Sequence, residues 1–390
     1  MIALDAIRFN LQTVVASGPL NVRKNATDWI ALPEWRRKGC VNVEDSLAVF
    51  AIASLVDDVI SVGAWFSNDD AAIRNADIRA IDNAYFPPQG KGGRVASIFQ
   101  RVSAAGADPS IVLREQSVAF RDGETGMLRF DLVDPRIDRT RVGMYDCEWQ
   151  WQYRLPEDGT WRKFAVSRHR IYITLDIPYQ PWQQTPYAFE NTQLLWSDVL
   201  DYSCRWAAGS RNKHEVAVAI TRGVNALAPE IITFDAPGGA SSHYAWSSFD
   251  CTAFLDRLAG GIGNGPYVNG SDCAAIVVTF ANALGCDLWQ ARMGFGFSVN
   301  EVRTLGSRAW QKPGLWPGLT YHEVAWEEAC GDDDPVYDAC IDFQEGLAAG
   351  LRFGHATAHA EDSYRNRLAA RSGRYQCDAQ PQTRVRLPVK

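Results

Sequence analysis

The chain has 390 residues, of which 46% are hydrophobic and 22% are charged, the mixture of an ordinary globular protein with two or three domains. Its 39 basic and 46 acidic residues give a net charge of −7, which argues against a nucleic-acid binder and against a protein attracted to anionic membranes. This composition also excludes a disordered chain, a collagen and a coiled coil.

Two further features bear on the compartment. No apolar run reaches the roughly 18–20 residues needed to cross a bilayer, and residues 1–18 carry Asp5 and Arg8 within their apolar pattern, so that no secretory signal is expected. The nine cysteines include no Cys-x-x-Cys pair, and the six histidines form no ligand-spaced cluster with them. We therefore expect a cytoplasmic protein with reduced, mostly buried thiols and no zinc site.

The first part of the chain predicts β-structure. From Tyr145 to Tyr153 every second residue is apolar, the period of a half-buried strand, and 128–132 and 169–175 alternate in the same way. Turn residues separate these runs at 122–123 and 158–159. The pattern over 45–65 does not decide between helix and strand. Short strands separated by such turns predict an antiparallel β-sandwich over residues 1–180.

A proline-rich stretch from Pro178 to Pro186 marks a domain boundary, and we expect a linker over 181–194. Beyond it, the apolar spacing predicts helices near 199–206, 216–227, 251–258 and 273–284, and strands at 231–234, 288–293, 319–326 and 336–343. Helices followed by strands indicate an α+β domain over 195–345. Residues 346–390, Arg-rich from about 361, are expected to be a tail that lies over the surface or is mobile.

The most informative stretch is a Gly- and Asn-rich loop followed by helix formers that start at Cys273. Ser271 or Asp272 is expected to cap this helix, which puts Cys273 in the first turn, where the helix dipole favours a thiolate. Cys251 also follows an aspartate, but it lacks the Gly-rich loop and starts a shorter helix, so that Cys273 is the better candidate nucleophile. The alternative for Cys273 is a buried structural thiol.

A thiolate nucleophile needs a base, and the base needs an acceptor that orients it. His322 lies on the predicted strand 319–326, and a turn over 327–335 leads to the next strand, where Asp338 and Asp342 share a face. Antiparallel pairing about this turn puts His322 opposite roughly residue 340, so that both aspartates are diagonal neighbours of His322 within side-chain reach.

The order of these residues, from Trp196 to Phe343, resembles the transglutaminase-like core of the papain-like cysteine enzymes, as in bacterial transglutaminase-core proteins. In that core a nucleophilic cysteine opens a central helix, and a histidine and an aspartate lie on adjacent strands of a small antiparallel sheet. The resemblance implies Cys273 as nucleophile, His322 as base and Asp338 as orienter, with Asp342 as the alternative orienter. It also implies a papain-fold core after the β-sandwich and a cysteine-dependent acyl transfer on a peptide or protein amide.

Several expectations complete this interpretation. The Cys273 backbone N–H would hold the oxyanion together with Asn269 or Tyr267, and His243 would line the cleft. No cofactor and no metal are expected, and Asp332–Asp334 reads as a solvated turn. The partner would be a protein or peptide substrate, with hydrolysis favoured over cross-linking or deamidation, and neither nucleic acid nor membrane would be bound. The competing hypothesis is a non-catalytic binding or assembly module that keeps the same fold.

Overall fold

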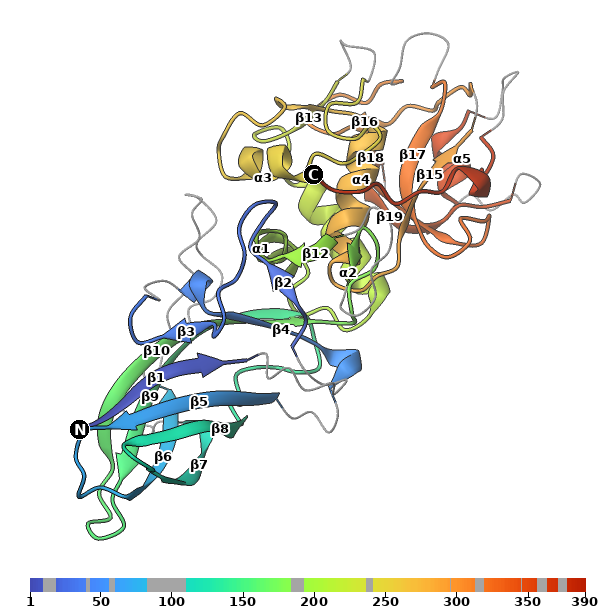
Figure 1. Cartoon of the computed structure of the whole chain (residues 1–390). Coiled ribbons are helices and arrows are strands. Elements are labelled where there is room, and N and C mark those ends of the chain that lie inside the picture. Colours follow the sequence, from blue (N-terminus) through green and yellow to red (C-terminus); the bar gives the residue numbers. More distant parts are fainter. Residues whose placement is uncertain are drawn as a thin grey trace. The chain divides into compact units, whose positions relative to one another are not determined.

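The computed structural model describes residues 1–9, 19–39, 43–55, 60–82, 110–183, 193–235, 241–294, 296–312, 319–344, 346–355, 363–370 and 377–390. The chain divides into two compact units, Met1–Ile177 and Pro178–Lys390 (Figure 1). Trp182, inside the expected linker, is buried in the second unit and donates from Nε1 to the Thr279 carbonyl oxygen at 2.9 Å. Residues 184–192 of that linker lie outside the described residues. None of the described helices is long and apolar enough to span a bilayer.

The first unit is built on one nine-stranded sheet. All its described pairings are antiparallel except that of β10 with β4. In sheet order the strands are β3 (Trp35–Arg36), β1 (Ile2–Arg8), β5 (Ile60–Asn68), β8 (Glu124–Leu132), β7 (Ile111–Ala119), β6 (Asn75–Asp82), β9 (Gly143–Arg154), β10 (Arg162–Thr174) and β4 (Leu47–Ala51). A short strand β2 (Val22–Arg23) and the 3₁₀ turns η1 (Val43–Asp45) and η2 (Ile52–Ser54) complete the described elements. The undecided region 45–65 therefore contributes strands β4 and β5.

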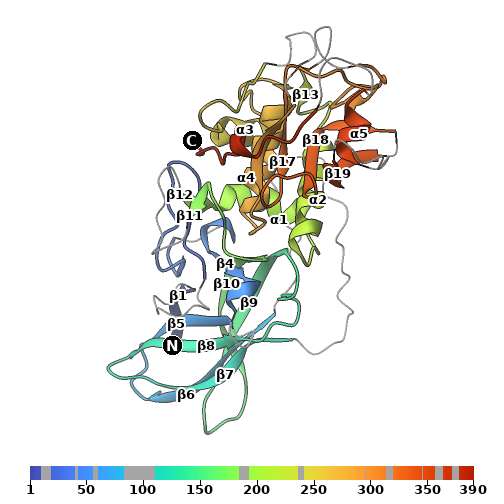
Figure 2. The same cartoon turned by 90° about the vertical axis from the view of Figure 1, so that its right-hand side faces the viewer.

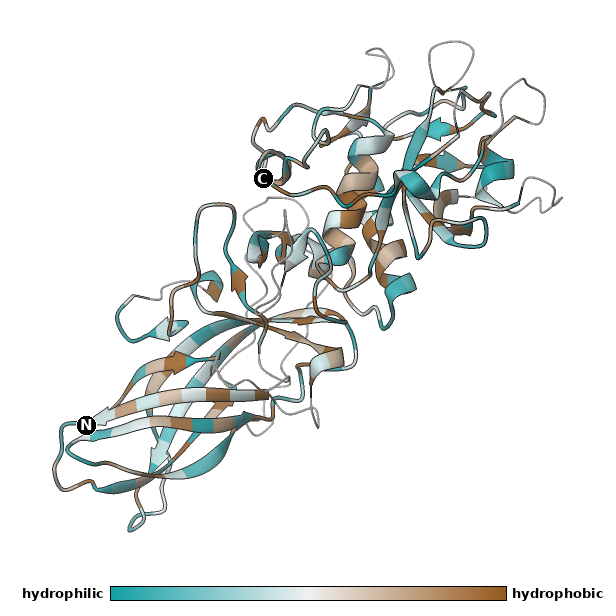
Figure 3. Cartoon of the chain, turned by 45° about the vertical axis from the view of Figure 1, so that its right-hand side comes forward, coloured by the Kyte–Doolittle hydropathy of each residue, from teal (hydrophilic) through white to brown (hydrophobic). Residues whose placement is uncertain are grey.

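The sheet curls around a single core. Phe66 on β5 and Trp151 on β9 are separated in the sheet by β8, β7 and β6, yet their ring centroids lie 5.5 Å apart. Hydrophobic and hydrophilic residues alternate along these strands (Figure 3), because one face of each strand lines the core and the other does not. The alternation from Tyr145 to Tyr153 therefore correctly predicted strand β9. The sequence predicted an antiparallel β-sandwich over residues 1–180, whereas the described strands that line this core form one curled sheet.

The second unit mixes helices with a small sheet. Its helices are α1 (Ser197–Trp206), α2 (Lys213–Asn225), α3 (Cys251–Leu258), α4 (Gly270–Asn282) and α5 (Tyr364–Leu368). The sheet runs β15 (Trp289–Met293), β17 (His322–Trp326), β18 (Pro335–Phe343) and β16 (Arg303–Thr304), with β19 (Gly346–Arg352) also paired to β18. Two short parallel pairs, β13 (Thr233–Phe234) with β14 (Tyr267–Val268) and β11 (Trp182–Gln183) with β12 (Gln193–Trp196), and the turn η3 (Pro381–Thr383) complete its described elements. The unit is therefore α+β.

Helix α4 is the central element of this unit. All thirteen of its residues are buried, and it packs against β17 and β18 on one side and against α1 and α2 on the other (Figure 2). Small and apolar residues such as Ala274, Ala275 and Val278 make up most of α4, which is the composition of a helix buried on every side. Side chains at its first turn consequently meet the two strands that carry His322 and Asp338.

The expected tail belongs to the second unit. Residues 346–352 form β19, so a boundary at residue 345 would cut through the sheet. Further on, Val385 exchanges backbone hydrogen bonds with Gln290 of β15 at 2.8 and 3.0 Å, and Ala379 bridges Met293. Arg386 pairs with Asp287 and lies 3.7 Å over the Trp289 ring. Residues 377–390 thus cover the outer edge of β15 through backbone pairing as well as through their arginines, a contribution that composition alone does not reveal.

Candidate functional site

Helix α4 begins three residues before Cys273. The Asn269 side chain accepts a hydrogen bond from the Asp272 N–H at 3.0 Å, and the Asp272 carboxylate accepts from the Asn269 N–H at 3.0 Å. This reciprocal capping box makes Asn269 the N-cap and Gly270 the first helical residue. The expectation that Ser271 or Asp272 caps the helix is therefore wrong, since both lie inside it, and Cys273 is the fourth helical residue.

Asp272 also fixes a neighbouring loop. Its carboxylate accepts hydrogen bonds from the backbone N–H groups of His243, Tyr244 and Ala245, at 2.7 to 2.9 Å. The side chain is fully buried, and burial raises the pKa of this carboxyl although four backbone donors act against that shift. Asp272 thus ties residues 243–245 to the first turn of α4.

His322 and Asp338 form a buried pair beside this turn. His322 Nε2 lies 2.9 Å from Asp338 Oδ2, and the two side chains are 4% and 1% exposed. The strands align as the turn predicted, with Ala325 opposite Tyr337. Asp342, the alternative orienter, instead pairs with Arg303, whose Nε lies 3.0 Å from Oδ2. Of the two candidate orienters, the structure brings Asp338 to the histidine.

Asp338 receives two further hydrogen bonds. The Tyr364 hydroxyl donates to Oδ2 at 2.6 Å, and the Cys340 backbone N–H donates to Oδ1 at 2.8 Å. An ionised carboxylate only accepts hydrogen bonds, so the proton between the ring and Asp338 belongs to His322 Nε2. In the neutral imidazole, Nδ1 is then the unprotonated nitrogen.

The residue that faces Nδ1 is Gly270. A Cβ atom added to Gly270 would lie 2.5 Å from Nδ1 and 2.6 Å from Cε1 of His322, closer than real Cβ atoms approach their neighbours. The imidazole edge therefore lies directly against the backbone of the first residue of α4. Glycine allows this approach because it has no side chain.

Cys273 lies one turn further along α4. It is 1% exposed, and its thiol shares a hydrogen bond with the thiol of Cys340 on β18. That hydrogen bond lowers the pKa of Cys273, but burial and the carboxylates of Asp338 and Asp272 raise it, and the pKa ends above its ordinary value. The depressed pKa expected from the helix dipole is therefore not found. Among the described contacts, none joins Cys273 to His322.

Cys251 opens α3, as expected, but it is equally buried, and burial raises the pKa of its thiol well above the usual value. All eight cysteines in the described part of the chain are buried and free of disulfides, whereas Cys40 lies outside that part. Neither candidate thiol is therefore an exposed, activated group of the kind that reacts fast.

Two of the three expected oxyanion donors already donate to other acceptors. The Cys273 N–H donates to the Asn269 carbonyl oxygen at 3.0 Å as part of the helix, and the Asn269 Nδ2 atom donates to Ser242 Oγ at 3.0 Å. Tyr267 is 43% exposed, and its ring centroid lies 6.0 Å from that of His243. His243 lies beside the start of α4, where its backbone N–H donates to the Asp272 carboxylate.

The structure adds a partner for His243 that sequence reasoning missed. Asp235, at the end of β13, places Oδ2 3.3 Å from His243 Nε2. Because β13 and β14 are parallel, the ends of both strands meet at the start of α4. The spacing of Asp235 and His243 carries no motif, so only the strand pairing could have revealed this pair.

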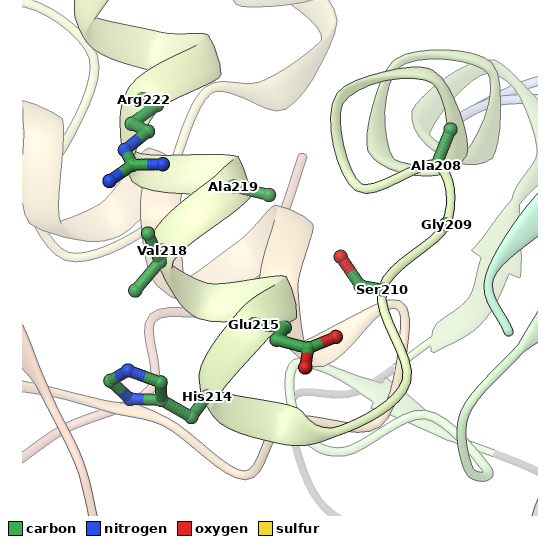
Figure 4. A pocket seen from close by; sticks show the side chains of 8 residues that line it. All are labelled: Ala208, Gly209, Ser210, His214, Glu215, Val218, Ala219 and Arg222. Atoms are coloured by element: carbon green, nitrogen blue, oxygen red, sulfur yellow. The ribbon is translucent and has the colours of Figure 1, made fainter.

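A pocket of about 410 Å³ lies away from these residues, on α2 and the turn before it (Figure 4). Its lining includes Ser210, His214 and Arg222. His214 Nδ1 is 3.0 Å from the Tyr337 hydroxyl, which hydrogen-bonds to Glu327. Within the described residues, no group of three or more His, Cys, Asp or Glu side chains is arranged to hold a metal ion.

Comparison with known proteins gives a coarse likeness in structure alone. No family model matches the chain, and no curated protein matches it. A search of solved structures finds red sea bream transglutaminase, 13% identical, with a TM-score of 0.37. The match covers 72% of this chain and 48% of that one, so the chain spans about half the length of the structure it matches. The match is to the family that the sequence resembles.

Proposed function

We propose that the second unit is a transglutaminase-like module that binds a protein partner and carries out no cysteine-dependent acyl transfer. The observation that carries this proposal is the contact between His322 and Gly270, where a Cβ would lie 2.5 Å from Nδ1. In the family that the sequence resembles, the nucleophile opens the central helix. Here glycine opens α4, and glycine offers no thiol for the base to deprotonate.

A protein partner is favoured by exposed apolar side chains beside the same helix start. Trp246 is 75% exposed, Ile262 81% and Tyr267 43%. Their loops are joined by a hydrogen bond from Asn264 Nδ2 to the His243 carbonyl oxygen at 3.0 Å. Aromatic side chains that are exposed in a free protein are the usual anchors of protein interfaces.

The second candidate is the acyl transfer with Cys273, His322 and Asp338 that the sequence predicts. The observation in its favour is the assembled His322–Asp338 pair, with 2.9 Å between Nε2 and Oδ2. It requires the Cys273 thiol to leave its hydrogen bond with Cys340 and to become accessible. Hydrolysis, deamidation and cross-linking would all pass through that thiol.

Thiol labelling separates the two candidates. Wild type, Cys251→Ser and Cys273→Ala are treated with iodoacetamide near neutral pH, and labelled peptides are identified by mass spectrometry. The proposal predicts no fast labelling of Cys273 in wild type, because its thiol is buried and hydrogen-bonded to Cys340. Cys251→Ser, which removes the thiol that opens α3, should leave the labelling of Cys273 as slow as in wild type. Fast labelling of wild type that disappears in Cys273→Ala would instead establish the acyl-transfer candidate.

Photo-crosslinking tests the partner face. A benzoylphenylalanine at Trp246 or Tyr267 should capture one discrete protein partner, and the same residue at the exposed Glu230 should not. Equal capture from all three positions would contradict a partner face at the start of α4.

A further inference from the structure

Tyr364 reaches the site from the segment that was expected to be a tail. Its helix α5 is capped by Ser363, whose hydroxyl accepts from the Asn366 N–H at 3.3 Å. The backbone is held on both sides, since Arg365 N–H donates to the Phe353 carbonyl oxygen at 2.9 Å and Asn300 N–H donates to that of Leu368 at 2.8 Å. The position of Tyr364 is thus fixed by contacts that do not involve Asp338.

The hydroxyl of Tyr364 shares an acceptor with His322. It donates to Asp338 Oδ2 at 2.6 Å, and His322 Nε2 lies 2.9 Å from the same oxygen. The Tyr364 side chain is fully buried, and its ring packs edge-on against Phe343 with centroids 5.6 Å apart. One carboxylate oxygen therefore serves two buried donors.

Two donors on one oxygen compete for its charge. In a buried site of low dielectric, a stronger hydrogen bond from one donor weakens the bond from the other. Burial raises the pKa of the Tyr364 phenol well above its ordinary value, so the hydroxyl keeps the proton that it donates. The other titratable groups that act on the pair within the described residues are Cys340 on β18, Cys273 and Asp272 on α4, and Cys377. The Asp272 carboxylate is already saturated by backbone donors.

We propose that Tyr364 is a positioning residue of this site. By donating to Asp338 Oδ2, it reduces the negative charge that Asp338 presents to His322, and it thereby sets the strength of the Nε2 hydrogen bond that orients the ring with Nδ1 toward Gly270. The inference goes beyond the proposed function, because it concerns only the contacts among Tyr364, Asp338 and His322.

Nuclear magnetic resonance of the full chain, labelled with ¹⁵N-histidine, tests the proposal directly. The His322 resonances are assigned with a His322→Gln variant. In Tyr364→Phe, Oδ2 loses one donor, so the remaining hydrogen bond should strengthen and the Nε2 proton should move downfield. A 3-fluorotyrosine introduced at position 364 by amber suppression keeps the shape but is a stronger donor, so the proton should move upfield.

Tyr337→Phe is the matched control, because it removes a buried hydroxyl from β18 that bonds to Glu327 and His214 rather than to Asp338. It should leave the His322 resonances as in wild type. Unchanged resonances in both Tyr364 variants, or shifts in the same direction in both, would overturn the proposal. The measurement uses the partner-free protein, so its outcome is independent of the thiol labelling. The fluorinated variant decides the question even if Tyr364→Phe folds poorly.

Discussion

Two buried histidines, one in each unit, are held in different ways. In the first unit His169 is fully buried, with Nδ1 2.7 Å from the Ser46 hydroxyl and Nε2 2.7 Å from that of Ser167. In the second unit His322 binds a carboxylate through Nε2 and directs Nδ1 at the backbone of Gly270. Hydroxyls can donate or accept, so either neutral tautomer of His169 is satisfied, whereas a carboxylate selects one tautomer. His169 therefore has the environment of a structural residue and His322 that of a site residue.

The largest expected effect is the loss of stability of the first unit in acid. Burial lowers the pKa of His169 from 6.5 to about 3, so the unfolded chain binds the proton more tightly than the folded one. Above pH 6.5 the neutral His169 leaves the free energy of unfolding at its full value. As the pH falls from 6.5 toward 3, this free energy decreases by about 1.4 kcal/mol per pH unit, or roughly 5 kcal/mol in total.

Hydrogen exchange of β9 and β10 in the full chain, corrected for intrinsic rates, measures this loss. In His169→Gln the free energy of opening of these strands should be lower than in wild type at pH 6.5. It should, however, change much less between pH 6.5 and 3. His355→Gln, which removes a half-exposed histidine of the second unit, should keep the wild-type slope. Equal slopes in His169→Gln and wild type would place the acid sensitivity elsewhere.

The next effect concerns the carboxylate that distinguishes His322. Asp338→Ala leaves His322 Nε2, the Tyr364 hydroxyl and the Cys340 N–H without their common acceptor. We expect this to cost about 3–5 kcal/mol of unfolding free energy. Asp342→Ala removes a carboxylate from the same strand whose partner Arg303 is 43% exposed, and should cost about 1 kcal/mol or less. Denaturant titrations followed by hydrogen exchange in β17 and β18 give both changes in the free energy of unfolding. Similar changes would show that the buried hydrogen bonds of Asp338 stabilise the unit no more than the partly exposed pair of Asp342 and Arg303.

The smallest effect tests the contact with Gly270. Replacing glycine by alanine in a helix normally raises the free energy of unfolding by up to about 1 kcal/mol. Here Gly270→Ala should instead lower the free energy of unfolding by about 1–3 kcal/mol, because the added Cβ would displace the His322 ring. Combined with His322→Ala, the same change should become neutral or stabilising, since the obstructing ring is gone. Additive effects in this double-mutant cycle would mean that the ring and Gly270 do not meet as described.

The sequence predicted the scaffold of the site better than its reactive centre. The helix 251–258 and the strands near 288–293 and 336–343 followed from apolar spacing, and the turn between the last two strands of the site fixed the alignment of His322 with Asp338. Such patterns persist because a buried face must be apolar at every repeat.

The start of α4 could not be located in this way. Gly270, Ser271 and Asp272 have the composition of a loop, so the sequence predicted a helix that begins at Cys273. The missed signal was the pair Asn269 and Asp272, which has the spacing of a capping box. Tyr364 carried no local signal, because its role depends on a contact with a strand 26 residues earlier.

The strand-like segment that covers β15 also has a kinetic consequence. Gln290 and Val385 are paired although 95 residues separate them along the chain. During synthesis the outer edge of β15 therefore stays bare until that whole stretch has left the ribosome, and an uncovered edge is where nascent chains pair with one another. Because such a distant contact also closes a long loop, we expect the docking of residues 377–390 to be among the late steps of folding.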